Sequence, residues 1–141
     1  MSFLYAIDPG VHMCGIAVFD DTRLISAFYG KLPEDGNYST CELIIEMPRI
    51  YPGSGQQKGD LNDLLNLAAV VGHNEALFSA LRSRRVFPAQ WKGQVPKKAM
   101  NQRILKRLSL FEAARIQSAG AKSHNVIDAV GIGLFACGRL K

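Results

Sequence analysis

The first third of the chain alternates short apolar runs with polar turns, a pattern that predicts β-strands. Three runs come first, at residues 3–8, 14–19 and 24–29. Pro9 and Gly10 turn the chain after the first run, and Asp20 and Asp21 turn it after the second, which predicts an antiparallel meander. A fourth run, at residues 42–45, is apolar after its first residue and is typical of a strand buried on both faces.

A helical pattern follows. Asp60 can cap a helix that runs to about residue 81. The apolar residues that form its predicted core stripe are Leu61, Leu64, Leu65, Ala68, Val71, Leu77 and Leu81. Gly72 within this helix costs roughly 1 kcal/mol relative to alanine, so we expect another helix or a partner subunit to pack closely there.

The last third of the chain predicts a short strand, a loop and three helices. The strand is expected at residues 85–87 and the loop at residues 88–95. The helices are expected at residues 96–108, 109–119 and 126–137. Pro96 suits the first turn of a helix, and Ser109 with Glu112 forms a capping box. Trp91, in the loop, is expected to fill the core rather than to stack on a base. This order predicts an α/β fold in a single domain of residues 1–141, with a mixed β-sheet, an antiparallel meander at the N-terminus and flanking helices.

Composition places the chain among soluble globular proteins, with 141 residues of which 48% are hydrophobic and 21% charged. The N-terminal run lacks the basic residues of a signal peptide, and no segment approaches the ~20 apolar residues that spanning a bilayer requires. Cys14, Cys41 and Cys137 are odd in number and far apart, which indicates free core thiols in a reducing compartment. We therefore expect a cytoplasmic protein with no membrane partner.

Charge is distributed unevenly along the chain. Residues 82–107 contain nine basic residues and no acidic one, whereas residues 1–46 contain seven acids and only Arg23 and Lys31 as bases. An acidic pole for metal and a basic pole for phosphate are typical of a nuclease surface. The alternative for the basic run is a solvated helix face, although such faces usually interleave acids.

Three acids carry the predicted chemistry. Asp8 and Glu46 end apolar runs, and Asp128 opens the last helix. Each has an ordinary explanation, as a turn residue, a strand end or a partner of the helix dipole, but the three can converge on one point. Desolvated carboxylates repel one another, and a divalent cation relieves that repulsion. We expect one or two Mg²⁺ ions there, with Mn²⁺ as a substitute, for phosphodiester hydrolysis.

Two further residues are candidates for the same site. His124 and Asn125 precede Asp128 by four and three residues, so on a helix they share its face. Asn125 is a candidate metal ligand or, alternatively, the N-cap of the last helix. His124 is a candidate catalytic residue that contacts the scissile phosphate or orients the attacking water. The alternative for His124 is a solvated loop histidine.

Three segments match the motifs of one known family in the family's order. IDPG (residues 7–10), followed by CGIA (residues 14–17), matches its first-strand motif. IE (residues 45–46) matches its second acidic motif, and HNVIDA (residues 124–129) matches its C-terminal motif. Over most of its length the chain thus resembles the RuvC-type Holliday junction resolvases of the ribonuclease H-like superfamily, particularly their small phage and prophage members.

This resemblance implies a ribonuclease H-like fold and a metal-dependent endodeoxyribonuclease that resolves Holliday junctions and related branched DNA by paired symmetric nicks. It also implies a homodimer, with the helix from Asp60 at the interface, in the cytoplasm of a bacterium or a phage-infected host. Asn125 departs from the family, which usually has Asp or His at that position. Either metal preference is altered or catalysis is lost, and the retained acids and His124 favour a surviving site.

DNA contacts are expected from two segments. In the related resolvases, the loop after the second acid places an aromatic residue in the junction centre. Here Tyr51, supported by Arg49, could stack on an unpaired base, or it is an ordinary loop aromatic. Lys92, Lys97 and Lys98 are the candidates for phosphate contacts.

Two other functions stay open. A RuvC-related nuclease that trims ribosomal RNA precursors has a similar length and the same first motif, but its Asp-Glu…Thr-Thr segment is not found here. A catalytically impaired protein that binds branched DNA is the second alternative, and Asn125 motivates it.

Overall fold

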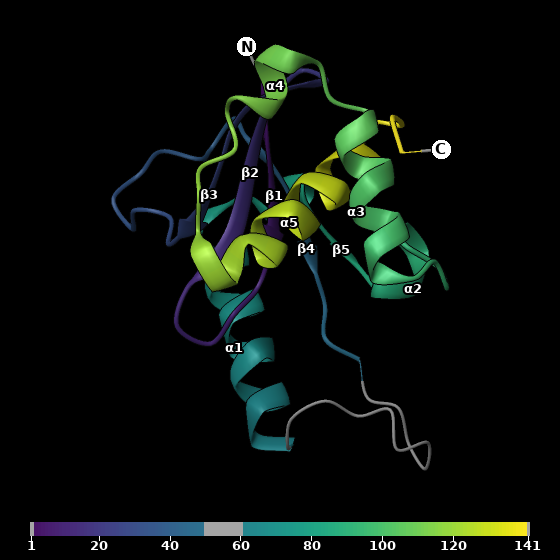
Figure 1. The fold of residues 1–141 in the computed structure, drawn as a ribbon. Coiled ribbons are helices and arrows are strands. Elements are labelled where there is room, and N and C mark those ends of the chain that lie inside the picture. Colours follow the sequence, from purple (N-terminus) through teal and green to yellow (C-terminus); the bar gives the residue numbers. More distant parts are fainter. Residues whose placement is uncertain (1, 50–60, 141) are drawn as a thin grey trace.

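The computed structural model describes residues 2–49 and 61–140. Within them, a mixed sheet of five strands forms the centre of the fold, in the order β3-β2-β1-β4-β5 (Figure 1). The strands are β1 Phe3–Asp8, β2 Cys14–Asp20, β3 Arg23–Gly30, β4 Glu42–Glu46 and β5 Ser83–Val86. The first three pair antiparallel, and β4 is parallel to both β1 and β5. The predicted meander and the buried fourth strand are confirmed.

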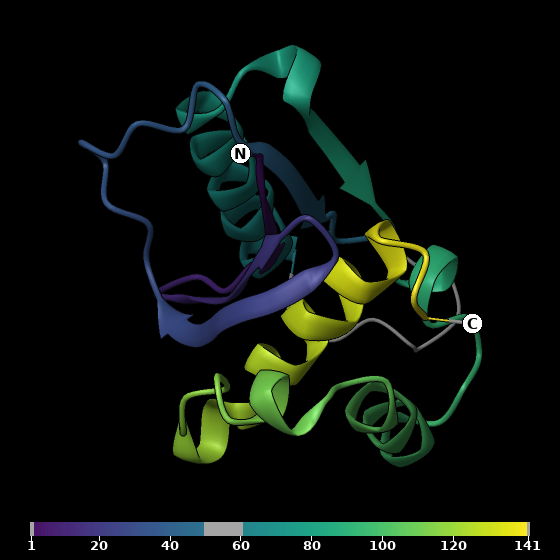
Figure 2. The same cartoon turned by 90° about the horizontal axis from the view of Figure 1, so that it is seen from above.

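Helices cover both faces of this sheet. They are α1 Leu61–Leu77, α2 Pro88–Trp91, α3 Lys97–Lys106, α4 Leu110–Ala113 and α5 Ser123–Ala136. Helix α1 lies on one face, whereas α5 crosses the other face and contacts α2 and α3 (Figure 2). In the described part of the chain, no helix has both the length and the apolar character needed to cross a membrane.

Alternation along the strands divides the core into two layers. Ala6 of β1 and Ile44 of β4 belong to the layer that contains α5, whereas Ile7 belongs to the layer beneath α1. Because successive side chains on a strand point to opposite faces, the residues two positions after Ala6 and Ile44 also face α5. These residues are Asp8 and Glu46, so the strand pattern itself directs both acids to the same side of the sheet.

Helix α1 packs differently from the prediction. Val71 is fully buried, but Leu61 and Leu65 are 62% and 68% exposed because the first half of α1 extends beyond the end of the sheet (Figure 1). Leu81 follows the helix and is 98% exposed. The predicted core stripe is therefore wrong at these three leucines. Close packing of another helix of this chain at Gly72 is also wrong for the described residues, since a Cβ added there would meet no atom within 4 Å; packing by a partner subunit stays a prediction.

Helix α4 starts where the sequence predicts but ends earlier. Ser109 Oγ accepts a hydrogen bond from the Glu112 N–H at 3.2 Å, which confirms the capping box. After one turn the chain leaves the helix because it pairs with the edge strand β3, where the Ala27 N–H donates to the Arg115 carbonyl at 3.2 Å. The predicted cap of α1, Asp60, lies outside the described residues.

The segment after β5 is more ordered than predicted. Residues 88–95 contain the short helix α2 in place of a continuous loop. Trp91, at the end of α2, is 5% exposed and fills the core as predicted. Cys14 and Cys41 are buried and Cys137 is partly buried, as expected for thiols in apolar stretches.

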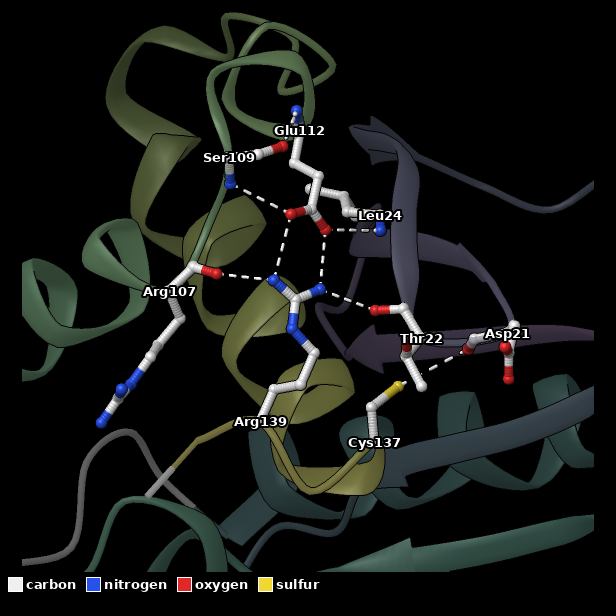
Figure 3. A network of polar contacts seen from close by, with 8 residues as sticks. All are labelled: Asp21, Thr22, Leu24, Arg107, Ser109, Glu112, Cys137 and Arg139. Carbon is white, nitrogen blue, oxygen red and sulfur yellow. Dashed lines mark hydrogen bonds and ion pairs between the residues drawn. The ribbon is translucent and has the colours of Figure 1, made fainter.

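Glu112 forms a buried network that joins α4, β3 and the chain after α5 (Figure 3). One carboxylate oxygen accepts hydrogen bonds from the Leu24 N–H at 2.8 Å and from Arg139 Nη1 at 2.7 Å. The other accepts from Arg139 Nη2 and from the Ser109 N–H, both at 3.0 Å. Arg139 is the largest cause that lowers the pKa of Glu112 to about 2.

Replacing Glu112 by glutamine should destabilise the protein in a pH-dependent way. Its folded-state pKa of about 2 lies below the ordinary value of 4.5, so the carboxylate stabilises the fold above pH 4.5 and loses this effect as the pH falls toward 2. By linkage the contribution near neutral pH is on the order of 3 kcal/mol. We expect E112Q to lower the free energy of urea unfolding by about that amount at neutral pH, and by about half of it or less at about pH 3. Equal losses at both pH values would assign the effect to packing instead of charge.

Candidate active site

Asp8 and Glu46 come together because β1 and β4 are parallel neighbours. Ala6 pairs with Ile44 and Ile7 pairs with Ile45, so the same register places the last residues of the two strands side by side. Both side chains are directed to the face of the sheet that α5 covers, and both are partly buried. The predicted position of each acid at the end of a strand is confirmed.

Asp128 reaches this point because α5 lies unusually close to β2. Gly15 of β2 pairs with Asp8 across the sheet. A Cβ added at Gly15 would collide with the backbone carbonyl of Asn125 and press on the N–H of Val126. Only a residue without a side chain lets the first turn of α5 rest on the strand at this height. Asp128, one turn further along α5, is therefore held near the end of β1.

The electrostatics indicate that the three carboxylates act on one another. Burial is the largest cause that raises the pKa of Asp8 well above its usual value, and the neighbouring Glu46 and Asp128 raise it further. Burial also raises the pKa values of Glu46 and Asp128. A hydrogen bond with Asp8 lowers the pKa of Glu46 without offsetting burial. Destabilised charged forms of neighbouring carboxyl groups are typical of a functional site.

Two lysines approach these acids. Lys92 follows α2, and its Nζ lies 5.2 Å from the centre of the Trp91 ring. Lys92 and Lys97 both lower the pKa values of Asp8 and Asp128. Two members of the basic segment thus lie near the acids, although the two groups are far apart along the chain. Lys98 follows Lys97 in α3 and is exposed.

His124 and Asn125 lie in the first turn of α5, which begins three residues before the predicted start at residue 126. Asn125 is therefore inside the helix, and its predicted role as N-cap is wrong because Lys122 occupies that position. His124 is exposed, with Nδ1 3.1 Å from the Ala121 carbonyl oxygen. Its charge lowers the pKa of Asp128, which agrees with the predicted common face.

The loop after Glu46 is described only in part. Arg49 is exposed, and its guanidinium carbon lies 5.9 Å from the centre of the Phe87 ring at the start of α2. Tyr51, the predicted stacking residue, lies outside the described residues.

Trp91 is a member of the site that sequence reasoning missed. Its indole Nε1 donates a hydrogen bond of 2.6 Å to Glu46 Oε2. This bond is one of the causes that lower the pKa of Glu46, against the larger effect of burial. A signal was present, because the N–H of a buried tryptophan usually requires an acceptor. The sequence does not identify that acceptor, which lies 45 residues earlier in the chain.

The donor set fits a hard divalent cation in its chemistry. Oxygen atoms of carboxylates are the ligands that Mg²⁺ prefers, and three such groups meet here with their charges incompletely compensated. Among the described residues, however, no group of three or more His, Cys, Asp or Glu side chains is arranged so that it could hold a metal ion as it stands. Asp8 and Glu46 at the ends of β1 and β4, with Asp128 on α5 beside them, are the candidates that could supply oxygen ligands to an ion.

The fold defined by this sheet and its helices is ribonuclease H-like. Within that class it is similar to solved structures of the resolvase RuvC. Thermus thermophilus RuvC in complex with a Holliday junction substrate has a TM-score of 0.59 and 14% identity, covering 94% of this chain and 90% of that chain. A second Thermus thermophilus RuvC structure has a TM-score of 0.55 and 16% identity, covering 99% and 98%. No family model and no curated protein sequence matches the chain. The predicted fold and its resemblance to RuvC are confirmed.

Replacing Gly15 by alanine should push the first turn of α5 away from the sheet. We expect a loss of about 1–3 kcal/mol in the free energy of unfolding, because the added methyl group meets backbone that cannot move aside easily. Urea denaturation measures the change. Gly72→Ala is the matched control, since open space surrounds Gly72 in a helix, and it should stabilise the protein by up to about 1 kcal/mol. A Gly15→Ala protein as stable as the wild type would contradict the proposed close approach.

Proposed function

We propose that this protein is a metal-dependent endonuclease that resolves Holliday junctions and related branched DNA by paired symmetric nicks, with residues 1–141 acting as one domain. The observation that carries the proposal is the meeting of Asp8, Glu46 and Asp128 on a ribonuclease H-like fold, with Lys92 and Lys97 beside them. Acids that can hold a cation and lysines that can hold a phosphate are both required for hydrolysis of a nucleic-acid backbone.

Each residue has a distinct part in the proposed reaction. Asp8, Glu46 and Asp128 hold Mg²⁺ or Mn²⁺, with Asn125 or His124 completing the ligand set. When bound, the cations supply an activated water and stabilise the leaving 3′ oxygen. Lys92 and Lys97 attract the scissile phosphate and compensate for the negative charge of the acids. His124 is exposed beside Asp128, so it can reach the phosphate or the attacking water.

Branched DNA is the proposed substrate for two reasons. One of the structures with the same fold is RuvC bound to a Holliday junction. A homodimer would present two such sites to symmetric strands, and the exposed start of α1 supports this assembly. Leu61 and Leu65 are more than half exposed there, and with Met47, Leu64 and Ala68 they line an apolar groove of about 340 Å³. Paired apolar grooves of this kind suit an interface between copies of the chain.

A binding protein without catalysis is the second candidate. Asn125 favours it, because an amide is a weaker metal ligand than the Asp or His that the resembled family has at this position. Such a protein would keep the lysines and the fold but would hold the metal ion too weakly to cut DNA.

Cleavage of a labelled four-way DNA junction separates these candidates. We expect paired nicks on the junction but not on a matched linear duplex, in Mg²⁺ or Mn²⁺ but not in EDTA. Asp8→Asn should abolish the nicks while binding, measured by gel shift in EDTA, stays equal or becomes tighter because a negative charge near phosphate is removed.

The other outcomes are equally informative. Tight junction binding without nicks in either metal would favour the binding protein and indicate that Asn125 disables the site. Cleavage of RNA but not of DNA would favour a ribosomal RNA-processing nuclease. Normal cutting by the Asp8→Asn protein would contradict the proposed metal site.

Lys97 and Lys98 should contribute to DNA binding through charge. Replacing both by alanine should weaken junction binding. The slope of the logarithm of the binding constant against the logarithm of salt concentration should become shallower by about 2, because one phosphate contact is lost for each lysine. Fluorescence anisotropy over a salt series measures this slope. Lys31→Ala is the control, because Lys31 lines a cavity together with α1 residues on the opposite face of the sheet. An unchanged slope in the double variant would place the DNA path elsewhere.

A further inference from the structure

The hydrogen bond between Trp91 and Glu46 connects two neighbouring strand ends. Strands β4 and β5 are parallel, and Glu46 pairs with Val86 in their register. The pairing continues one residue further, where the Met47 N–H donates to the Val86 carbonyl at 2.8 Å. Helix α2 follows β5 almost immediately, and its last residue is Trp91. The short distance along the chain from Val86 to Trp91 therefore fixes where the indole can lie relative to Glu46.

The indole ring is held firmly from the other side. A Cβ added at Gly131 of α5 would collide with the Trp91 ring and with the Ile104 side chain. Trp91 is 5% exposed and Ile104 is fully buried, so both pack directly against the backbone of α5. At the start of α2 the Phe87 N–H donates to Gln90 Oε1 at 2.7 Å, which closes the first turn. These contacts hold the indole so that its N–H points toward Glu46 Oε2.

We propose that Trp91 is a positioning residue that holds the Glu46 carboxylate in the orientation required for divalent-cation binding; this inference rests on the proposed nuclease function. A glutamate side chain has several rotatable bonds, and fixing them in advance removes an entropic cost of binding. The bond uses Glu46 Oε2, and Glu46 also shares a side-chain hydrogen bond with Asp8, the other proposed ligand from the neighbouring strand end. An indole is a neutral donor, so it orients the carboxylate without adding a positive charge that would compete with the metal ion.

Replacing Trp91 by benzothienylalanine tests the inference directly, because this amino acid keeps the shape of indole but has sulfur in place of the N–H. We expect Mg²⁺ affinity, measured by calorimetry without DNA, to fall by about 10-fold to 100-fold, as for other groups that orient metal ligands. The folded structure should be retained, as judged by circular dichroism and melting temperature. Trp91→Phe provides a second, genetically simple variant with the same expected direction.

Ile104→Val is the matched packing control. It removes a methyl group from the same contact with Gly131 but leaves the Trp91–Glu46 hydrogen bond in place. We expect Mg²⁺ affinity close to that of the wild type in this variant. An equal loss of affinity in Ile104→Val and in the benzothienylalanine protein would overturn the proposal, because packing would then explain both. Unchanged affinity in the benzothienylalanine protein would also overturn it.

A spectroscopic measurement tests the same contact in the unmodified chain. Trp91 is the only tryptophan in the sequence, so the intrinsic tryptophan emission reports on its environment alone. Adding Mg²⁺ should change this emission along a saturable curve whose midpoint agrees with calorimetry, and Glu46→Gln should abolish the change. Saturable Mg²⁺ binding by calorimetry with no change in emission would overturn the proposal.

Failure of this proposal and failure of the proposed function give different results. If Mg²⁺ affinity depends on the Trp91–Glu46 hydrogen bond but the wild type cuts no junction, the positioning role stands and the nuclease function fails. If the wild type cuts junctions and the benzothienylalanine protein cuts them with the same Mg²⁺ dependence, the function stands and the positioning role fails. Where positioning holds, the variant should lose kcat at limiting Mg²⁺ with little change in KM for the junction, and excess Mg²⁺ should restore part of kcat.

Discussion

The close approach of α5 to the sheet is the constraint on which the rest of the structure depends. At Gly15 the strand has no side chain, and the first turn of the helix rests on it. Further along, α5 itself lacks side chains at two positions. The Trp91 and Ile104 side chains pack at Gly131, and the Phe19 side chain packs at Gly133. The helix is therefore packed from the sheet side and from the side of α2 and α3. Because Asp128 belongs to this helix, its position is as firmly determined as that of a core residue.

Bringing three acids to one end of the sheet has an energetic cost. Burial and mutual repulsion raise the pKa of Asp8 and so disfavour its charged form. The neighbours offset part of this cost, since Lys92 and Lys97 act through their charge and Trp91 donates a hydrogen bond to Glu46. None of these neighbours removes the repulsion. Such an arrangement in an otherwise well-packed core is typical of functional sites, where groups needed for chemistry lower the stability of the fold.

Local rules are enough to predict the strands and the two acids at their ends. Alternation and turn residues determine β1 and β4, and Asp8 and Glu46 follow their last apolar residues. Contacts between distant segments could not be predicted this way. The start of α5 depends on the preceding turn at Gly120–Lys122, so Asn125 is not the cap. The exposed leucines of α1 have a helical spacing, but spacing cannot reveal that the helix extends past the sheet. The acceptor for Trp91 is likewise fixed only by the pairing of β4 with β5.

Two glutamates in this chain show how the surroundings of a carboxylate decide its use. Glu112 and Glu46 both accept N–H donors in a largely desolvated setting. The pKa of Glu112 is lowered to about 2, chiefly because Arg139 supplies a full counter-charge through two hydrogen bonds. The pKa of Glu46 is raised instead, because burial outweighs the neutral indole donor, the charge of Lys92 and a hydrogen bond with Asp8, and Asp128 adds repulsion. A carboxylate whose charge is already balanced, such as Glu112, stabilises the fold and offers nothing to a cation. A carboxylate oriented by a neutral donor and left short of positive charge, such as Glu46, has the chemical character of a cation ligand.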